Sequence, residues 1–292
     1  MPTPNRPRQP TSHSAWQWLV TDDGSRTLWD VGRKETFHSG CGAVAETLIV
    51  YVDHSGVLSR LRQQVPTKVL EYGLGTATSF LLTASLAEHY RTPLVYTALE
   101  CSLLPSEILG QLDLAKSVES CLSGGFAKTP VADPLFELRE FAELPSMIGA
   151  LVDAVAEWQQ RPIPRPLVTR IGQFVTLQLW IGDACHWTPQ QTRLSALHST
   201  VSDANQMHTG QAAGYDAVYF DPFSPETNPE LWTSEVLEVA AAALCPGGLL
   251  TSYCVKSTVR RAMQQCGMLV RKAAGPVGGK REVLVAQRPA RP

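Results

Sequence analysis

The sequence has no long run of uncharged apolar residues, and its cysteines do not come in pairs. A membrane-spanning helix needs about 20 consecutive predominantly apolar residues, and none occurs among the 292 residues. The seven cysteines lie singly, without a C-x-x-C pair, whereas zinc sites and disulfide frameworks draw on closely spaced pairs. The first residues also lack the apolar core of a secretory signal. We therefore expect reduced thiols, a cytoplasmic location, no metal site and no membrane contact.

Charged residues are sparse and unevenly distributed. Only 18% of the residues are charged, while 44% are hydrophobic, which is enough to bury a core. The net charge of the whole chain is only −2, but residues 1–255 are acidic, with 16 Lys and Arg against 26 Asp and Glu. Residues 256–292 carry nine basic residues against one acidic residue. A basic C-terminal region on an acidic protein suits binding of a polyanionic partner. A solvent-exposed tail would have the same charge pattern, so charge alone does not distinguish the two interpretations.

The order of the expected elements indicates an α/β fold. Residues 1–15 are expected to be a disordered tail, 16–65 a small β-rich N-terminal extension, and 66–292 the main domain, with a helical insertion at about 102–170 that ends in a proline-rich connector at 161–166. Strands are expected at 67–72, 94–99, 174–181, 217–220, 249–255 and 283–286, and helices at 79–90, 104–114, 135–144, 146–159, 234–244 and 257–266. Such alternation is typical of a doubly wound, mostly parallel sheet with helices on both faces.

Three of the expected strands end in residues that suit a nucleoside ligand. In a doubly wound sheet, ligands lie beyond the carboxyl ends of the strands, where the strand order reverses. Gly73 and Gly75 let backbone N–H groups approach a ligand closely, the Glu100 carboxylate can accept from both hydroxyls of a ribose, and Asp183 suits the amine of an adenine. NAD enzymes and S-adenosylmethionine (SAM) enzymes share these features. Because Thr78 replaces the third glycine of G-x-G-x-x-G, SAM is favoured; plain turns at the strand ends are the alternative.

The segment 219–232, YFDPFSPETNPELW, holds the residues most suited to chemistry. A strand delivers Asp221, two prolines restrict the backbone behind it, and Phe223 and Trp232 flank it. A fixed carboxylate can accept a hydrogen bond from an amino group and orient its lone pair for in-line attack on a methyl group. Aromatic walls exclude water and stack a base. The pattern therefore favours methylation of a nitrogen, although a proline-rich loop whose tryptophan plugs the core would have the same sequence.

Several blocks of the sequence resemble the MnmC/MnmD-type methyltransferases of tRNA. The blocks are TDDGSRTL (21–28), FHSG (37–40), GAVAET (42–47), EYGLGT (71–76), LWIGD (179–183), DAVYFDPFSPETNPELWT (216–233), CPGGLLTSYCVKSTVRRAMQQCGM (245–268) and GGKREVLVA (278–286). They extend from about residue 16 to residue 287, and 102–170 is the least matched part. The Asn-Pro-x-Leu-Trp-Thr loop at 228–233 is specific to this family, whereas the glycine turn is common to many methyltransferases.

The resemblance implies a Rossmann-like class I SAM-dependent methyltransferase fold and a defined reaction. One methyl group would pass from SAM to the amine of 5-aminomethyl(-2-thio)uridine at the tRNA wobble position, giving 5-methylaminomethyl(-2-thio)uridine. The form would be the stand-alone methyltransferase without the flavin oxidase domain. Its partners would be the tRNA anticodon loop and, functionally, a separate enzyme that makes the aminomethyl group.

The resemblance also implies roles for individual residues. Asp221 is the expected catalytic residue. The expected cofactor-binding residues are Ser39, Glu46, Gly73, Gly75, Thr76, Glu100 and Asp183, and the expected substrate-binding residues are Phe223, Ser224, Pro225, Trp232, Lys280 and Arg281. The sequence departs from the family at Ala77, where relatives usually have Gly, at Thr78-Ser79, which replace Leu-Asn, and at Pro222, where Gly or Ala is usual.

Two other functions remain open from the sequence. Another SAM-dependent amino-methyltransferase, acting on a small molecule or an adenine amine, could also use the Asp221-Pro222-Phe223 sequence, although the continuation at 228–233 argues against it. A non-catalytic SAM-binding or RNA-binding module is suggested by the departures at Ala77 and Pro222.

Overall fold

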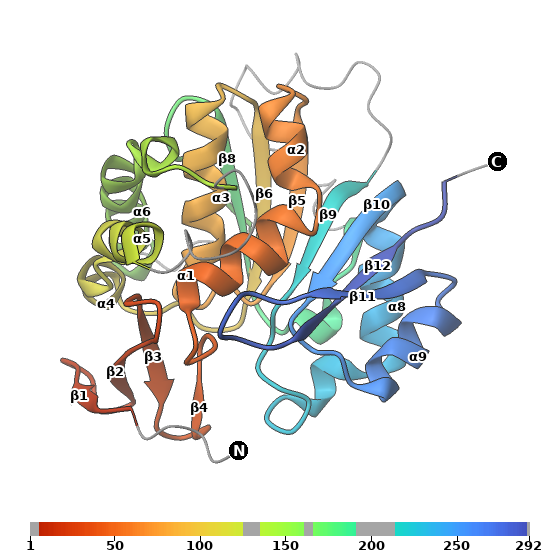
Figure 1. Ribbon diagram of the computed structural model, residues 1–292, viewed down its shortest axis with the longest axis horizontal. Coiled ribbons are helices and arrows are strands. Elements are labelled where there is room, and N and C mark those ends of the chain that lie inside the picture. Colours follow the sequence, from red (N-terminus) through yellow and green to blue (C-terminus); the bar gives the residue numbers. More distant parts are fainter. Residues whose placement is uncertain (1–5, 125–134, 161–165, 191–213, 291–292) are drawn as a thin grey trace.

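The main sheet has eight strands, and a smaller sheet has four (Figure 1). The computed structural model describes residues 6–124, 135–160, 166–190 and 214–290. The main-sheet strands are β5 (Thr67–Tyr72), β6 (Leu94–Glu100), β7 (Leu167–Arg170), β8 (Val175–Ile181), β9 (Tyr215–Phe220), β10 (Leu244–Ser252), β11 (Leu269–Ala274) and β12 (Glu282–Gln287). The small sheet holds β1 (Arg8–Pro10), β2 (Trp16–Val20), β3 (Arg26–Asp30) and β4 (Glu35–Thr36).

The order of the main strands is β11-β12-β10-β9-β5-β6-β8-β7. The five central strands, from β10 to β8, are parallel, while β7, β12 and β11 are antiparallel to their neighbours. The chain builds outward from β5 through β6 to β8, and then returns to place β9 on the other side of β5. The strand order therefore reverses between β5 and β9, which is where a doubly wound sheet holds its ligand.

Helices cover both faces of the main sheet, as the sequence predicts. The helical segments are α1 (Ala43–Glu46), the π-helix η1 (Thr47–Asp53), α2 (Val57–Arg62), α3 (Thr78–His89), α4 (Ser106–Gln111), α5 (Leu114–Gly124), α6 (Leu144–Gln160), α8 (Ser234–Ala243) and α9 (Ser257–Gln265), with short 3-10 turns η3 (Leu138–Phe141), η4 (Ala184–His186) and η6 (Pro229–Trp232). Side chains of β9 alternate between the two cores. Ala217 and Tyr219 join the core that contains η1, α2, α3 and α6, and Val218 and Phe220 join the core that contains α8 and α9.

The N-terminal part differs from the expected tail and β-rich extension. Strand β1 pairs with β2, so residues 6–15 are structured, and residues 1–5 lie outside the described residues. Residues 43–62 are mostly helical rather than β-rich. The apolar run Leu48–Val52 lies in η1 although its β-branched residues favour a strand, because most of its side chains are buried in the core beside α3. Tertiary packing here outweighs local propensity.

Two edge strands, both ends of β10 and the helix expected at 135–144, which is only the 3-10 turn η3, also differ from the sequence predictions. Strands β7 and β11 were not expected, because edge strands exposed to solvent lack a clear apolar pattern; β11 (LVRKAA) buries none of its residues fully. Strand β10 begins at Leu244 rather than 249, with a shift of register between Leu244 and Leu249. The described part of the insertion at 102–170 is mostly helical but ends in β7, and residues 161–165 of the connector lie outside the described residues.

None of the helices that the structure describes has the length and apolar character that crossing a membrane would require.

We predict that Phe80→Ala strongly destabilises the fold. Phe80 is fully buried in α3 and packs edge-on against Tyr96 at 5.1 Å between ring centroids. Removing a buried phenylalanine costs about 3–5 kcal/mol of unfolding free energy, which urea unfolding followed by circular dichroism would measure. Leu269→Ala is the control, because Leu269 is 61% exposed and should change stability by less than about 0.5 kcal/mol. Equal effects of the two substitutions would contradict the packing described here.

Candidate functional site

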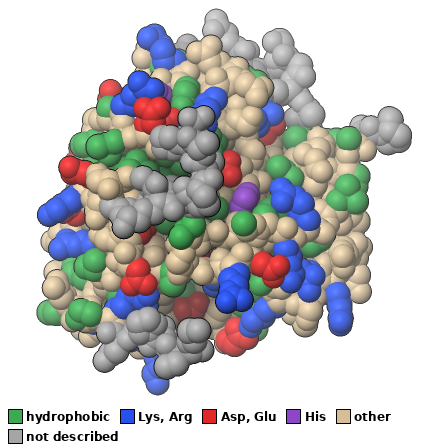
Figure 2. All heavy atoms as spheres, in the orientation of Figure 1, with side chains coloured by type: hydrophobic (Ala, Val, Ile, Leu, Met, Phe, Trp, Pro, Cys, Tyr) green, Lys and Arg blue, Asp and Glu red, His purple; other side chains and the backbone are tan. Residues whose placement is uncertain are grey.

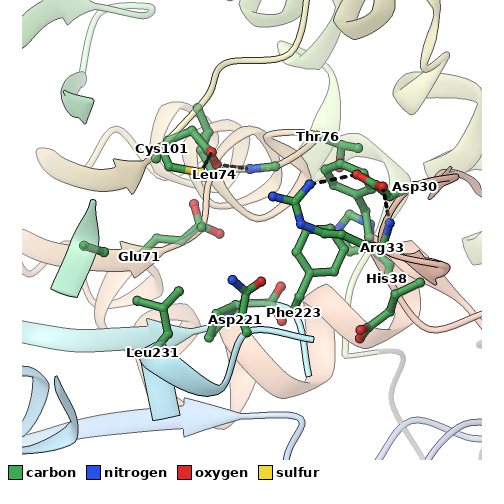
Figure 3. A pocket seen from close by; sticks show the side chains of 18 of the residues that line it. Asp30, Arg33, His38, Glu71, Leu74, Thr76, Cys101, Asp221, Phe223 and Leu231 are labelled. Carbon is green, nitrogen blue, oxygen red and sulfur yellow. Dashed lines mark hydrogen bonds and ion pairs between the residues drawn. The ribbon is translucent and has the colours of Figure 1, made fainter. Parts of the chain in front are cut away.

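A cavity of about 520 Å³ opens at the carboxyl ends of β5, β6, β8 and β9, where the strand order reverses (Figure 3). Its wall is built from distant parts of the chain. The described residues that line it include members of 30–39, 71–76, 99–104, 182–184 and 221–231, together with Glu46, Tyr253 and Lys280. The main sheet and the segment around β4 therefore enclose the cavity together.

The glycine turn after β5 is too tightly surrounded for side chains. Gly73 has φ of +89°, and a Cβ there would lie 3.2 Å from the backbone oxygen of Asp221. Gly75 has φ of +52°, and a Cβ there would lie 3.1 Å from Phe37. Thr76, predicted to bind the cofactor, is buried beside the cavity, and its hydroxyl lies 2.8 Å from that of Thr78. Ala77 has φ of +59° at the start of α3, a region that favours glycine.

The two predicted cofactor carboxylates both lie on the cavity wall. Glu100 accepts hydrogen bonds from the Gly75 N–H at 3.0 Å and the Ser102 N–H at 2.9 Å, so its carboxylate is fixed beside the glycine turn. Asp183 accepts from the Cys185 N–H at 2.9 Å, and this hydrogen bond lowers the pKa of Asp183. The narrow turn and the fixed Glu100 fit a nucleoside ligand such as SAM, because a ribose diol can approach Glu100 while backbone groups face the rest of the molecule.

Asp221 lines the same cavity directly after β9. The Tyr51 hydroxyl, on η1, donates a hydrogen bond to Asp221 Oδ1. Burial raises the pKa of Asp221 well above its usual range, and the nearby Glu46 raises it further, whereas the hydrogen bond from Tyr51 and the charge of Lys280 lower it. Figure 3 shows Asp221 and Glu71 among the residues that line this cavity. Asp221 therefore lies where the strand order reverses, and ionising its carboxyl group costs free energy.

Two further buried acids surround Asp221. Glu46 accepts a hydrogen bond from the Ser39 N–H at 2.8 Å, and burial raises its pKa. Glu71, at the end of β5, is 1% exposed, and its Oε2 makes no hydrogen bond; burial raises its pKa well above the usual range. Lys280 also lines the cavity, with Nζ 3.9 Å from the centroid of the Tyr253 ring. A positively charged ligand would therefore relieve repulsion between these acids.

Four of the residues predicted to bind substrate are absent from the cavity wall. Phe223 and Lys280 line the cavity, whereas Ser224, Pro225, Trp232 and Arg281 do not. Trp232 donates its indole N–H to the Phe223 backbone oxygen at 2.8 Å and packs against Phe220 at 5.1 Å between ring centroids. Trp232 therefore supports the loop through the backbone of Phe223 and the end of β9. Ser224 is likewise held by protein, through hydrogen bonds to Glu35.

Sequence reasoning missed several residues of the site. Tyr51 contacts Asp221 across 170 positions of sequence, and no local pattern indicates such a contact. Glu71 could have been found, because it lies two residues before Gly73. Tyr253 donates its hydroxyl to the Pro222 backbone oxygen at 2.9 Å. His38 also lines the cavity, and burial lowers its pKa to about 4, so its ring is neutral at pH 7.

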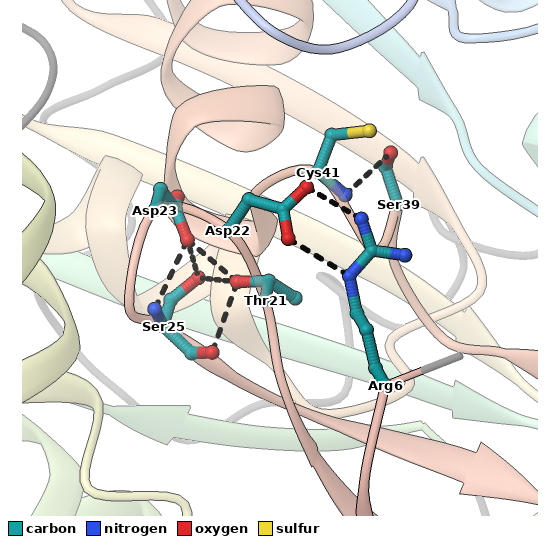
Figure 4. A network of polar contacts seen from close by, with 7 residues as sticks. All are labelled: Arg6, Thr21, Asp22, Asp23, Ser25, Ser39 and Cys41. Carbon is teal, nitrogen blue, oxygen red and sulfur yellow. Dashed lines mark hydrogen bonds and ion pairs between the residues drawn. The ribbon is translucent and has the colours of Figure 1, made fainter. Parts of the chain in front are cut away.

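A polar network fixes the N-terminal segment that carries Ser39 and Glu46 (Figure 4). Asp23 accepts hydrogen bonds from the Ser25 N–H at 3.0 Å and from the Ala45 N–H at 3.0 Å, which joins the turn after β2 to helix α1. Arg6 donates to Asp22 at 3.0 Å through Nε. The Cys41 N–H donates to the Ser39 hydroxyl at 3.3 Å. These contacts hold Glu46 in place beside the cavity.

All seven cysteines are free thiols. Among the described residues, no group of three or more His, Cys, Asp or Glu side chains is arranged to hold a metal ion.

We predict that Asp221→Asn stabilises the fold increasingly as pH rises. The folded-state pKa of Asp221 lies well above the ordinary 3.8, so the unfolded chain loses this proton at lower pH than the folded chain does. Between these two pKa values the wild type loses stability with rising pH, whereas the asparagine variant does not. Thermal unfolding at pH 5 and pH 8 should show an advantage in Tm of a few degrees that is larger at pH 8.

Asp183→Asn is the matched control for this prediction. The pKa of Asp183 is lowered in the folded state, so its ionised form stabilises the fold above the unfolded pKa and this contribution is lost at acid pH. The Asp183 variant should therefore be slightly less stable than the wild type at pH 8. If both variants behaved alike, the burial assigned to Asp221 would be wrong.

Comparison with known proteins connects this geometry to a family. Residues 150–289 match a family described as S-adenosyl-L-methionine-dependent methyltransferase. The protein described as "tRNA 5-methylaminomethyl-2-thiouridine biosynthesis bifunctional protein MnmC" from Burkholderia multivorans is 26% identical over 273 residues, which cover 91% of this chain and 34% of that protein. The protein of the same description from Ralstonia nicotianae is 29% identical over 259 residues, covering 87% and 32%. The chain thus spans about a third of the length of these relatives.

The fold matches a solved structure over nearly the whole chain. The crystal structure of MnmC2 from Aquifex aeolicus superposes with a TM-score of 0.61 at 21% sequence identity, covering 98% of this chain and 74% of that one. The strand order, the glycine turn and the acid at the end of β6 agree with the class I SAM-dependent methyltransferase fold that the sequence predicts. Residues 150–289 are thus similar to the S-adenosyl-L-methionine-dependent methyltransferases, and the fold of the chain is similar to that of MnmC2.

Proposed function

We propose that the protein transfers one methyl group from SAM to the primary amine of 5-aminomethyl(-2-thio)uridine at the wobble position of tRNA, giving 5-methylaminomethyl(-2-thio)uridine. The observation that carries this proposal is the position of Asp221. Its carboxyl lies in the same cavity as the glycine turn and is fixed by Tyr51. The names of the relatives from Burkholderia multivorans and Ralstonia nicotianae refer to synthesis of the same modified nucleoside.

The glycine turn and the two flanking acids are suited to hold the cofactor. SAM supplies a methyl group on a sulfonium sulfur, which makes it an activated donor. Glu100 would bind the ribose hydroxyls, Asp183 the amine of the adenine, and the backbone of Gly73 and Gly75 the adjoining part of the ligand. The contacts of Glu100 with the Gly75 and Ser102 N–H groups keep its carboxylate in one orientation before the ligand arrives.

Asp221 would position the amine and accept its proton. An alkylammonium ion must lose a proton before its nitrogen can attack, and a carboxyl with a raised pKa is a stronger base than an exposed one. The raised pKa of Asp221 therefore suits this role. The Tyr51 hydroxyl donates a hydrogen bond to Asp221 Oδ1, so Asp221 Oδ2 would accept the hydrogen bond from the amine. Phe223 and Tyr253, both on the cavity wall, would exclude water around the reacting groups.

The basic C-terminal region would bind the phosphates of the tRNA. Arg261, Arg271 and Arg281 are exposed, and none of them forms an ion pair with a residue that the structure describes. Figure 2 shows several Lys and Arg side chains over the part of the molecule formed by α9, β11 and β12. Lys280 joins this region to the cavity. We further propose that a separate enzyme makes the aminomethyl group beforehand and that both act in the cytoplasm.

The central prediction is that Asp221→Ala loses catalysis and keeps the cofactor. The assay is incubation of the protein with labelled SAM and tRNA from cells that lack this methylation, followed by nucleoside analysis. The parent protein should give labelled 5-methylaminomethyl(-2-thio)uridine. Since a positioned carboxylate contributes about 10²–10⁴-fold to proton transfer, the variant should lose at least a hundredfold in kcat, while calorimetry should show an almost unchanged Kd for SAM.

Transcribed tRNA without the aminomethyl group is the control substrate and should accept no label. Equal labelling of the two tRNAs would point to a different amine, such as that of an adenine. Turnover of Asp221→Ala at the parent rate would remove Asp221 from the mechanism, and SAM binding without any methylated product would favour a non-catalytic module.

We also predict that Tyr51→Phe shifts the pH dependence of methyl transfer to higher pH. The Tyr51 hydroxyl donates to the ionised form of Asp221 and so lowers its pKa. Without this hydrogen bond the pKa of Asp221 rises further, and the ascending limb of kcat/KM against pH should move up by about one pH unit. Tyr90→Phe, which removes a hydroxyl that contacts Arg62 and Glu140 at the far end of α3 and does not line the cavity, should leave the profile unchanged. A shift of the Tyr51→Phe profile to lower pH would contradict the assigned contact.

A further inference from the structure

Glu35 contacts the loop that follows Asp221, although the two lie far apart in the sequence. The residue belongs to β4, the last strand of the small sheet. Its Oε1 accepts a hydrogen bond from the Ser224 N–H at 3.0 Å, and its Oε2 accepts one from the Ser224 hydroxyl at 2.8 Å and another from the Thr227 hydroxyl. One carboxylate therefore binds three donors of the loop at 222–233, and this contact spans 189 positions of sequence.

The residues beside Glu35 contact both halves of the cavity. Phe37 packs edge-on against Phe223 of the loop, with 5.1 Å between ring centroids. It also lies against Gly75 of the glycine turn, where a Cβ would meet its ring at 3.1 Å. The guanidinium of Arg33 lies 5.1 Å from the centroid of the Phe223 ring and pairs with Asp30 at 2.9 Å. The small sheet thus touches the proposed cofactor side and the proposed substrate side of the cavity at once.

The middle of the loop has two external contacts, the hydrogen bonds to Glu35 and an exposed ion pair between Glu226 and Lys256. The two ends of the loop are held by the main domain, since the Tyr253 hydroxyl donates to the Pro222 oxygen and the Thr233 side chain caps α8. Between these ends, the Thr227 and Asn228 N–H groups both donate to the Ser224 oxygen at 2.8 Å. This turn is internal to the loop, and Glu35 joins it to the small sheet.

We propose that Glu35 is a positioning residue for methyl transfer. By holding Ser224 and Thr227, it fixes the loop so that Asp221 and Phe223 face the glycine turn. The inference rests on the proposed function and deepens it, because it makes the small N-terminal sheet a part of the catalytic cavity. Reaction rates depend steeply on alignment, and a misplacement of about 1 Å can cost about a hundredfold in rate. Loss of the Glu35 contacts should therefore lower kcat more than it weakens SAM binding.

The experiment compares Glu35→Ala and Glu35→Gln with the parent protein. Hydrogen–deuterium exchange of the peptide covering 222–233 reports on the loop without any substrate. In Glu35→Ala we expect exchange in this peptide to accelerate at least tenfold, kcat at saturating SAM to fall about ten- to a hundredfold, and the Kd for SAM to change less than threefold. Glu35→Gln should recover part of kcat, because its amide oxygen can still accept from the Ser224 N–H.

Glu107→Ala is the matched control. Glu107 is an exposed carboxylate that pairs with His13 at 2.8 Å, so it also joins the N-terminal segment to the main domain, but through α4 and away from the loop. Its loss should leave exchange at 222–233 and kcat unchanged, since exposed ion pairs contribute little.

Three results would overturn the proposal: unchanged loop exchange in Glu35→Ala, faster loop exchange with the parent kcat, or faster exchange that extends equally to the β5 peptide. The last result would mean that Glu35 supports the fold in general. Failure of the parent protein to methylate aminomethylated tRNA would instead overturn the proposed function, and the exchange measurement would still decide whether Glu35 holds the loop.

Discussion

The parallel pairing of β5 with β9 is the constraint on which the rest of the site depends. Tyr72 pairs with Phe220, so the residues that follow them, Gly73 and Asp221, emerge side by side at one edge of the sheet. The backbones come so close that a Cβ at Gly73 would lie 3.2 Å from the Asp221 oxygen. Glycine is favoured there because Gly73 has φ of +89° and a Cβ would crowd the Asp221 backbone. A turn suited to a nucleoside and a carboxyl suited to an amine thus share one cavity.

The pairing of β5 with β9 also brings several acidic side chains together at a buried site, where ionisation costs free energy. Asp221, Glu46 and Glu71 all have raised pKa values because of burial, and Lys280 is the lysine on the cavity wall. Proteins commonly give up stability at functional sites in this way. A positively charged ligand, such as a sulfonium or an alkylammonium ion, would lower the free energy that is needed to ionise these acids. The acids therefore lower the stability of the fold and favour the ligands that the proposed reaction requires.

The sequence predicted the parts of the fold that local patterns determine. The central strands were recognisable as apolar runs, and Gly73, Gly75, Glu100, Asp183 and Asp221 could be placed at one edge because parallel strands end together. Leu48–Val52 was mistaken for β structure because its β-branched residues gain more from burial in η1 than local propensity indicates. The contacts of Ser224 with Glu35 and of Trp232 with Phe223 could not be predicted, because spacing does not reveal which way a loop side chain points. Tyr51 and Glu35 reach the site through contacts between distant segments, which no local pattern reveals.

The separation between Glu35 and Ser224 has a consequence for how the molecule is made. A ribosome delivers the small sheet first and the loop 189 residues later, and domains form as their contact partners become available. Until β9 and the following loop have left the ribosome, the Glu35 carboxylate cannot accept hydrogen bonds from the loop, and the Phe37 ring cannot pack against Phe223. The cavity is therefore completed only when the segment around Glu35 meets a loop that is synthesised 189 residues later.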